Sequence, residues 1–194
     1  MTAQGRSHAG ELQRRPGRED ASACADHSRD SALEQRVQTL TAFYDQVRRE
    51  RMHGLAIVNP ALRVQALGFQ WVSGSSGQDI TADMAEGVLI TPWFMSLLRL
   101  PSDVQAHQNR VGRSQTRAFG CECFDFIGAH DAALGYHETC ALFSPMHDFD
   151  TQQLACDTAR EVLAALRPRR PAPAPVPAPA PPTRRAFFFG REAK

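Results

Sequence analysis

The stretch Gly87-Val88-Leu89-Ile90-Thr91-Pro92-Trp93-Phe94-Met95 indicates the fold class of this chain. Branched apolar residues come first, a proline stops them, and aromatic residues follow. This order is typical of a strand that ends at a tight turn before the next strand begins. Similar short runs recur along the chain. The predicted strands are 64–72, 87–91, 95–100, 118–127 and 136–143.

Short polar or glycine-containing connections join most of these strands. Residues 73–79 read Ser-Gly-Ser-Ser-Gly-Gln-Asp and predict a flexible hairpin loop, and residues 128–135 predict a second turn. Residues 101–117 are polar and predict a long loop. Such connections favour an antiparallel β-meander of about five strands.

Helices are predicted on both sides of the meander. Ser31 and Glu34 form a capping box at the start of the first helix, which ends before Gly54. The second helix covers residues 151–166, with Asp150 as its N-cap. We therefore expect an α+β fold in which an N-terminal and a C-terminal helix flank the sheet and cover one of its faces.

The chain divides into four segments by composition. Residues 1–30 are polar and predict a disordered extension, and residues 31–167 form the domain. Residues 168–182 are a Pro/Ala-rich linker whose 171–182 part, as polyproline II at about 3.1 Å per residue, spans roughly 35 to 40 Å. Residues 183–194 are an Arg/Phe tail. Its three successive phenylalanines predict a recognition element, because exposed aromatic clusters tend to aggregate.

Bulk properties restrict the class of protein. The formal net charge of +1 gives no field that would attract nucleic acid or an anionic membrane. No signal-peptide core and no run of about 20 apolar residues is present, so we expect a cytoplasmic protein without membrane insertion. The five cysteines are an odd number and contain no C-x-x-C pair, which fits a reducing compartment.

Several patterns in the sequence contain residue types that could form a chemical site. Cys121 and Cys123, with His137 and Cys140 on the next predicted strand, could form a metal site only if a bulge brought His137 and Cys140 to one face, so buried structural cysteines are favoured. Ser144-Pro145 lacks the glycine-flanked turn of a hydrolase nucleophile. No phosphate-binding glycine motif occurs.

Two proline-terminated strand ends carry clustered aromatic and methionine residues, which suit a groove for apolar segments or the rim of the core. The candidate partner-binding residues in the domain are Met52, His53, Trp93, Phe94, Met95, Phe143, Pro145 and Met146.

At these segments the chain resembles the HybE/HupJ family of nickel-iron hydrogenase assembly chaperones. The resemblance rests on Arg51-Met52-His53-Gly54-Leu55 with Asn59-Pro60-Ala61-Leu62, on the stretch 87–95, and on Cys140-Ala141-Leu142-Phe143-Ser144-Pro145-Met146. The tail Arg184-Arg185-Ala186-Phe187-Phe188-Phe189-Gly190-Arg191 resembles the end of some members.

The resemblance implies that residues 31–167 are a hydrogenase-assembly chaperone domain. On this basis we expect no enzyme activity and no cofactor. The partner of the domain would be the small-subunit precursor of an uptake hydrogenase, recognised through its mature part, its twin-arginine export signal or both. The large subunit and other maturation proteins would be further partners. The alternative is a metal- or redox-active accessory protein that uses Cys121 and Cys123 in iron-sulfur small-subunit maturation.

The tail adds Arg184, Arg185, Phe187, Phe188 and Phe189 to the candidate partner-binding residues. Thr183-Arg184-Arg185-Ala186-Phe187-Phe188 itself resembles the twin-arginine motif. The tail is therefore predicted to fold back and occupy the site that receives the export signal. The other interpretations are that it clamps a bound partner or packs on its own domain.

Overall fold

The computed structural model describes residues 18–72, 83–102 and 108–167, with the side chains of α1 described from residue 27. The predicted loop at 73–79 and the linker and tail at 168–194 lie outside these residues. The elements in chain order are α1 (Arg18–Glu50), β1 (Gln65–Val72), β2 (Met84–Ile90), β3 (Met95–Pro101), the 3-10 helix η1 (Gln108–Arg110), β4 (Ser114–Phe119), β5 (Glu122–Asp131), β6 (Gly135–Phe143) and α2 (Gln152–Leu166).

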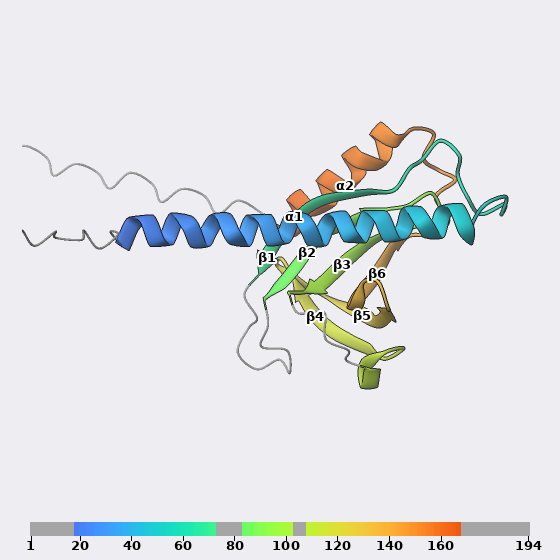
Figure 1. The fold of residues 1–194 in the computed structure, drawn as a ribbon. Helices are drawn as coiled ribbons and strands as arrows, with labels where there is room; N and C mark the ends of the chain where they lie inside the picture. Colours follow the sequence, from blue (N-terminus) through green and yellow to red (C-terminus); the bar gives the residue numbers. More distant parts are fainter. Residues whose placement is uncertain (1–17, 73–82, 103–107, 168–194) are drawn as a thin grey trace, which may run out of the picture.

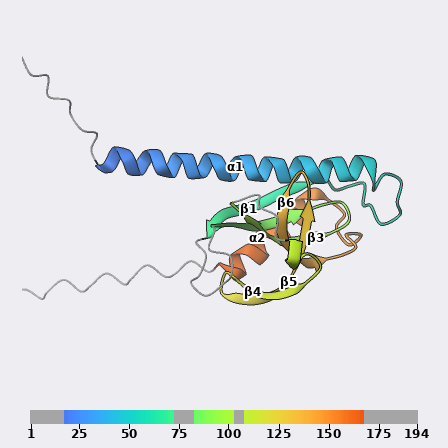
Figure 2. The ribbon, with the colours of Figure 1, turned by 60° about the horizontal axis from the view of Figure 1, so that its bottom comes forward.

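All neighbouring strands pair antiparallel, in the spatial order β1-β2-β3-β6-β5-β4. The predicted α+β class is confirmed. The two helices lie on opposite faces of the sheet (Figure 1; Figure 2). The core on the α1 side contains Leu40, Ala85, Leu89, Leu98, Leu100 and Leu134. The core on the α2 side includes Val88, Ile90, Leu97, Phe119, Phe126, Ala159 and Leu163.

The prediction that both helices cover one face is therefore wrong. Every residue of β2 and β3 is buried, because apolar side chains point alternately into the two cores. The uninterrupted apolar run Val88-Leu89-Ile90 is the sequence signal of a strand that is buried on both faces.

The region predicted as one strand at 118–127 is a hairpin. The chain turns at Gly120, whose φ of +63° is unfavourable for residues with a side chain. A Cβ atom there would also collide with the backbone carbonyl of Leu166. Strand β4 begins at Ser114, inside the segment predicted as a loop, and β5 continues to Asp131. The sheet therefore has six strands instead of about five.

Helix α1 begins at Arg18, so the predictions that order begins at Ser31 and that residues 18–30 are disordered are both corrected. Pro16 and Gly17 precede the helix, and neither residue type occurs again before Gly54, so nothing interrupts it at Ser31. The N-cap of α2 is Thr151 instead of Asp150, because the Thr151 side chain accepts a hydrogen bond from the Leu154 amide. No helix in the described parts of the chain is long and apolar enough to cross a membrane.

The C-terminal end of α2 is attached to both edges of the sheet. On the β1 side, the Arg167 guanidinium donates to the Gly68 carbonyl at 2.7 Å and to the Glu86 carbonyl at 2.9 Å. On the β4 side, the Cys121 amide donates to the Leu166 carbonyl at 2.8 Å. The sheet therefore curves around α2, as Figure 2 shows.

Strand β1 contains a bulge that decides which of its side chains face α1. Its register with β2 shifts between Leu67 and Gln70, and Gly68 in the bulge has a φ of +61°. Phe69 and Trp71 consequently join Ala66 on the α1 side, whereas strict alternation from Ala66 would point them toward α2.

A chain of buried charges crosses the sheet on the α2 side. Arg99 of β3 donates to Glu86 of β2 at 2.8 Å and to Glu138 of β6 at 2.7 Å. Glu138 also accepts from Arg117 of β4 at 3.4 Å and from the Tyr136 hydroxyl at 3.1 Å. Burial, together with the Glu138 carboxylate, raises the pKa of Tyr136 to about 12. Each of the two carboxylates is thus compensated by a guanidinium group.

Candidate functional site

Three segments meet at one end of the sheet and form a surface that we call the loop end (Figure 1). They are the loop 51–62 after α1, the turn 91–94 between β2 and β3, and the segment 143–151 from the end of β6 to α2. The buried Asn59 joins all three. Its backbone amide donates to the Pro92 carbonyl at 2.8 Å, and its side-chain amide donates to the carbonyls of Met146 at 2.9 Å and Phe149 at 2.8 Å.

Thr91 shapes the turn between β2 and β3. Its hydroxyl donates to the Phe94 carbonyl at 2.9 Å and accepts from the backbone amides of Phe94 at 3.0 Å and Trp93 at 3.3 Å. The turn packs on α1 through an edge-to-face contact between Phe94 and Tyr44, with 5.6 Å between ring centroids. Burial, with a contribution from Asp131, raises the pKa of Tyr44 to about 12, so the phenol stays neutral.

The structure separates the predicted contact residues into two groups. Met95 and Met146 are fully buried, and Trp93 is 8% exposed. Met95 points toward α2 in phase with Leu97, and both belong to the core there. The two methionines of the strand ends therefore pack in the core and do not line a surface.

The remaining domain candidates lie at or near the surface of the loop end. Phe143 is 38% exposed and contacts Phe149 edge to face, with 5.2 Å between ring centroids. Phe94 and Met52 are half-buried, whereas His53 and Pro145 are exposed. The tail candidates Arg184, Arg185, Phe187, Phe188 and Phe189 lie outside the described residues.

The loop end also carries exposed apolar residues that the sequence prediction missed. Six large apolar side chains are exposed in the described parts of the chain, and four of them lie in the loop-end segments or the adjoining first turn of α2. These four are Leu55, Ile57, Phe143 and Leu154. The available signal was Leu55-Ala56-Ile57, which lies between Gly54 and Pro60 and belongs to no periodic pattern. Such a concentration of apolar side chains is typical of a protein-binding surface.

Polar groups at the loop end do not form a catalytic arrangement. The Ser144 hydroxyl donates to the Trp93 carbonyl at 3.4 Å and to no histidine in the described residues. His147, Asp148 and Asp150 are exposed beside it. The arrangement provides an apolar surface with a charged margin, which suits binding.

The cysteines differ from the prediction in position and burial. Cys121 follows the turn glycine, and Cys121 and Cys123 are both exposed, so the expected burial of these two cysteines is wrong. Cys140 is partly buried and His137 is buried. Within residues 18–72, 83–102 and 108–167, no group of three or more potential ligands is placed to hold a metal ion.

Comparisons with known proteins agree on one family. The family described as "[NiFe]-hydrogenase assembly, chaperone, HybE" matches residues 35–190. Protein HoxT of Cupriavidus necator is 40% identical over 162 residues, which are 80% of this chain and 89% of HoxT. Probable rubredoxin HupJ of Rhodobacter capsulatus is 30% identical over 135 residues, which are 69% of this chain and 45% of HupJ.

A solved structure supports the fold. The solution structure of HybE from Escherichia coli superposes with a TM-score of 0.52 at 19% sequence identity, covering 82% of this chain and 91% of that one.

Proposed function

Because this chain belongs to the HybE family of nickel-iron hydrogenase assembly chaperones, we propose that it binds the precursor of a hydrogenase small subunit at the loop end. Binding is stoichiometric and without turnover, and it takes place in the cytoplasm before the small subunit joins the large subunit. The proposal is carried by one observation, which is the concentration of exposed apolar side chains on segments held together by Asn59.

The loop end is suited to this role because its surface is apolar while its backbone is fixed. Leu55 is 49% exposed and Ile57 is 40% exposed, yet Asn59, only a few residues further on, is anchored by hydrogen bonds to the other two segments. A preorganised apolar surface loses less conformational entropy when a partner binds. It therefore favours the capture of an unassembled subunit.

The test is a titration of the full chain with purified small-subunit precursor. The variant Leu55→Asp with Ile57→Asp places two charges on the loop end, and we expect precursor affinity to fall at least about tenfold, because a buried interface does not tolerate unpaired charges. The matched control is Val111→Asp with Ile127→Asp, which alters exposed apolar residues outside the loop end. Equal effects of the two double variants, with both still folded, would refute the loop-end assignment.

A second titration uses a precursor without its export signal. Unchanged affinity would mean that the mature part of the small subunit is recognised, and lost affinity would mean that the signal is recognised. Affinity for the isolated large subunit, measured in the same way, would show whether this chain contacts both partners.

Because the thiols of Cys121 and Cys123 are exposed, they are accessible for the alternative function, which is a metal or redox role. HupJ of Rhodobacter capsulatus is named a probable rubredoxin, but this chain matches only 45% of its length and contains no C-x-x-C pair. We expect the Cys121→Ser, Cys123→Ser variant to retain hydrogenase maturation. Loss of maturation together with loss of a stoichiometric metal from anaerobically purified protein would favour the alternative.

A further inference from the structure

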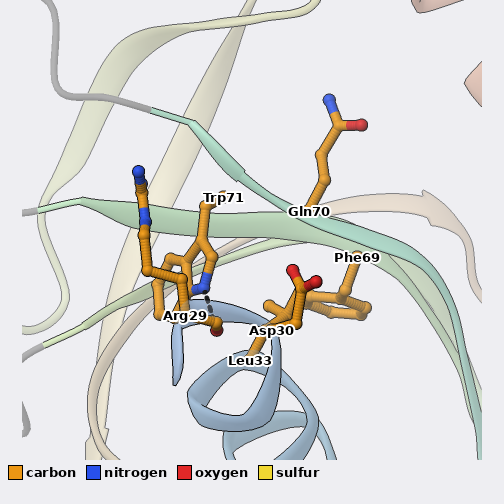
Figure 3. A pocket seen from close by; sticks show the side chains of 6 residues that line it. All are labelled: Arg29, Asp30, Leu33, Phe69, Gln70 and Trp71. Atoms are coloured by element: carbon orange, nitrogen blue, oxygen red, sulfur yellow. Dashed lines mark hydrogen bonds between the residues drawn. The ribbon is translucent and has the colours of Figure 1, made fainter. Parts of the chain in front are cut away.

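A groove runs between the first half of α1 and strand β1, away from the loop end. Arg29, Asp30, Leu33, Phe69, Gln70 and Trp71 line its first part (Figure 3). Glu34, Val37 and Ala66 extend it along the helix. Figure 3 shows the rings of Phe69 and Trp71 on the helix side of β1, with the Asp30 carboxylate beside Phe69 and Gln70 pointing away from the helix.

Specific contacts hold both walls of the groove. The bulge at Gly68 points Phe69 and Trp71 toward α1. A Cβ atom on Gly87 would collide with the Phe69 ring, so the missing side chain of Gly87 makes room for that ring. On the helix side, the Trp71 indole donates to the Arg29 carbonyl at 2.9 Å, and Arg29 pairs with Asp83 at 2.7 Å.

The chemistry of the groove is apolar with an acidic margin. Leu33, Val37, Phe69 and Trp71 are only half-buried, although they lie between a helix and a strand. Asp30 and Glu34 are exposed along the helix side of the groove, and no cation in the described residues pairs with either carboxylate. A ligand that combines positive charge with large apolar side chains would complement both features.

The chain carries a segment of this chemistry beyond α2. Residues 168–194 contain five arginines and one lysine against a single glutamate. Arg184 and Arg185 come directly before the three phenylalanines. The family match extends to residue 190, so this segment belongs to the part of the chain that the family shares.

The segment beyond α2, which begins after Arg167, starts close to the groove. Arg167 is hydrogen-bonded to Gly68, which directly precedes Phe69. To reach the groove from the α2 side, residues 168–182 would pass around β1, which is one of the two edge strands of the sheet. A helix is about 10 Å across, and the Pro/Ala linker at about 3.1 Å per residue is long enough for this passage. Edge strands of native sheets are commonly covered by another segment.

We propose that the groove between α1 and β1 is the docking site of residues 183–190 of the same chain. The phenylalanines pack on Leu33, Phe69 and Trp71, and the arginines pair with Asp30 and Glu34. Tethering keeps the local concentration of the segment high, so the groove stays occupied even when the contact is individually weak. This contact is independent of precursor binding at the loop end.

The test uses the full chain with the photoreactive residue p-benzoylphenylalanine in place of Phe188. After irradiation, mass spectrometry locates the cross-link. We expect intramolecular cross-links to residues 29–37 and 65–72. Cross-links to the loop end, cross-links between two chains, or none at all would each overturn the proposal. The same photoreactive residue in place of Val176, within the linker, is the control and should give less than a tenth of the cross-linking in the groove.

Charge reversal tests the ionic part of the contact. Asp30→Lys with Glu34→Lys should lower cross-linking at least tenfold, whereas Asp148→Lys with Asp150→Lys at the loop end should leave it unchanged. Arg184→Glu with Arg185→Glu should also abolish cross-linking in the groove. Combining the two arginine substitutions in the tail with the two lysine substitutions in the groove should restore cross-linking, because the charges again match. Failure of this rescue in a folded protein would overturn the assignment to Asp30 and Glu34.

Discussion

At the scale of single residues, the bulge glycine of β1 determines the composition of two surfaces. Gly68 adopts a φ of +61°, and the residues after it change face. Phe69 and Trp71 therefore line the groove beside α1, while Leu67 packs on the α2 side. A shift by one position would exchange these faces and place aromatic rings against α2.

We expect Gly68→Ala to lower the free energy of unfolding by at least about 1 kcal/mol, because an alanine is strained at positive φ. Its Cβ would also lie 2.5 Å from Cδ1 of Leu163. Gly54→Ala is the matched control, since Gly54 has a φ of +77° and no atom within 4 Å of an added Cβ. Urea denaturation of both variants measures the difference. An equal loss in the two would show that the contact with Leu163 contributes nothing.

His137 makes stability depend on pH. Burial lowers its pKa below the usual 6.5, while its hydrogen bond to the Gly135 carbonyl and the nearby Asp131 act in the opposite direction. The unfolded chain therefore takes up a proton near pH 6.5 that the folded chain resists, and the free energy of unfolding falls as the pH drops below 6.5.

His137→Gln should flatten this dependence between pH 7.5 and about 5.5, as judged by urea denaturation at several pH values. His147→Gln, which alters an exposed histidine, is the matched control. A steeper slope for the His137 variant would contradict the sign of the argument.

At the scale of elements, the loop end depends on a single amide. Asn59→Ala removes both donors to the Met146 and Phe149 carbonyls, and we expect the free energy of unfolding to fall by about 2–3 kcal/mol, because buried acceptors are left unpaired. Asn59→Asp should cost a similar amount, since a carboxylate cannot donate to those carbonyls although it still accepts from the Ala61 amide. If Asn59→Asp is as stable as the natural chain, the two donor bonds are unimportant.

The sequence predicted the elements well where local signals agree with the fold. The second helix and the strands around Thr91 and Tyr136 follow from apolar runs and proline stops. The hairpin at Gly120 was missed because apolar residues recur on both sides of the turn, between Ala118 and Ile127. The early start of α1 was missed because the capping pattern at Ser31 also fits a helix interior.

The sequence predicted which segments form the candidate site, but it predicted only some of the side chains that lie at the surface of that site. The motifs around Asn59, Pro92 and Pro145 do meet at one end, but the sequence could not show that Met95 and Met146 point inward. Their orientation depends on which face of the sheet α2 covers, and that is set by tertiary packing. The groove beside α1 was missed for the same reason, since it depends on the bulge at Gly68.

At the scale of the whole molecule, the buried charges connect four of the six strands. Arg99→Met would leave the Glu86 carboxylate buried without its cation, and we expect a loss of about 3–5 kcal/mol in the free energy of unfolding. Arg160→Met, which removes an exposed ion pair with Asp157, should cost no more than about 1 kcal/mol. Denaturant titration checks both variants. Similar losses would mean that the buried charges contribute no more to the free energy of unfolding than the exposed ion pair does.

The attachment of α2 to both sheet edges has a consequence for synthesis on the ribosome. Leu166 and Arg167, which hold the β4–β5 turn and β1, come after all six strands in the chain. A nascent chain that has emerged only to residue 150 has all six strands but lacks this closure, and the α2 face of its sheet is uncovered. Stalled chains of that length should aggregate or recruit ribosome-bound chaperones, whereas chains released after residue 167 can close the sheet without assistance.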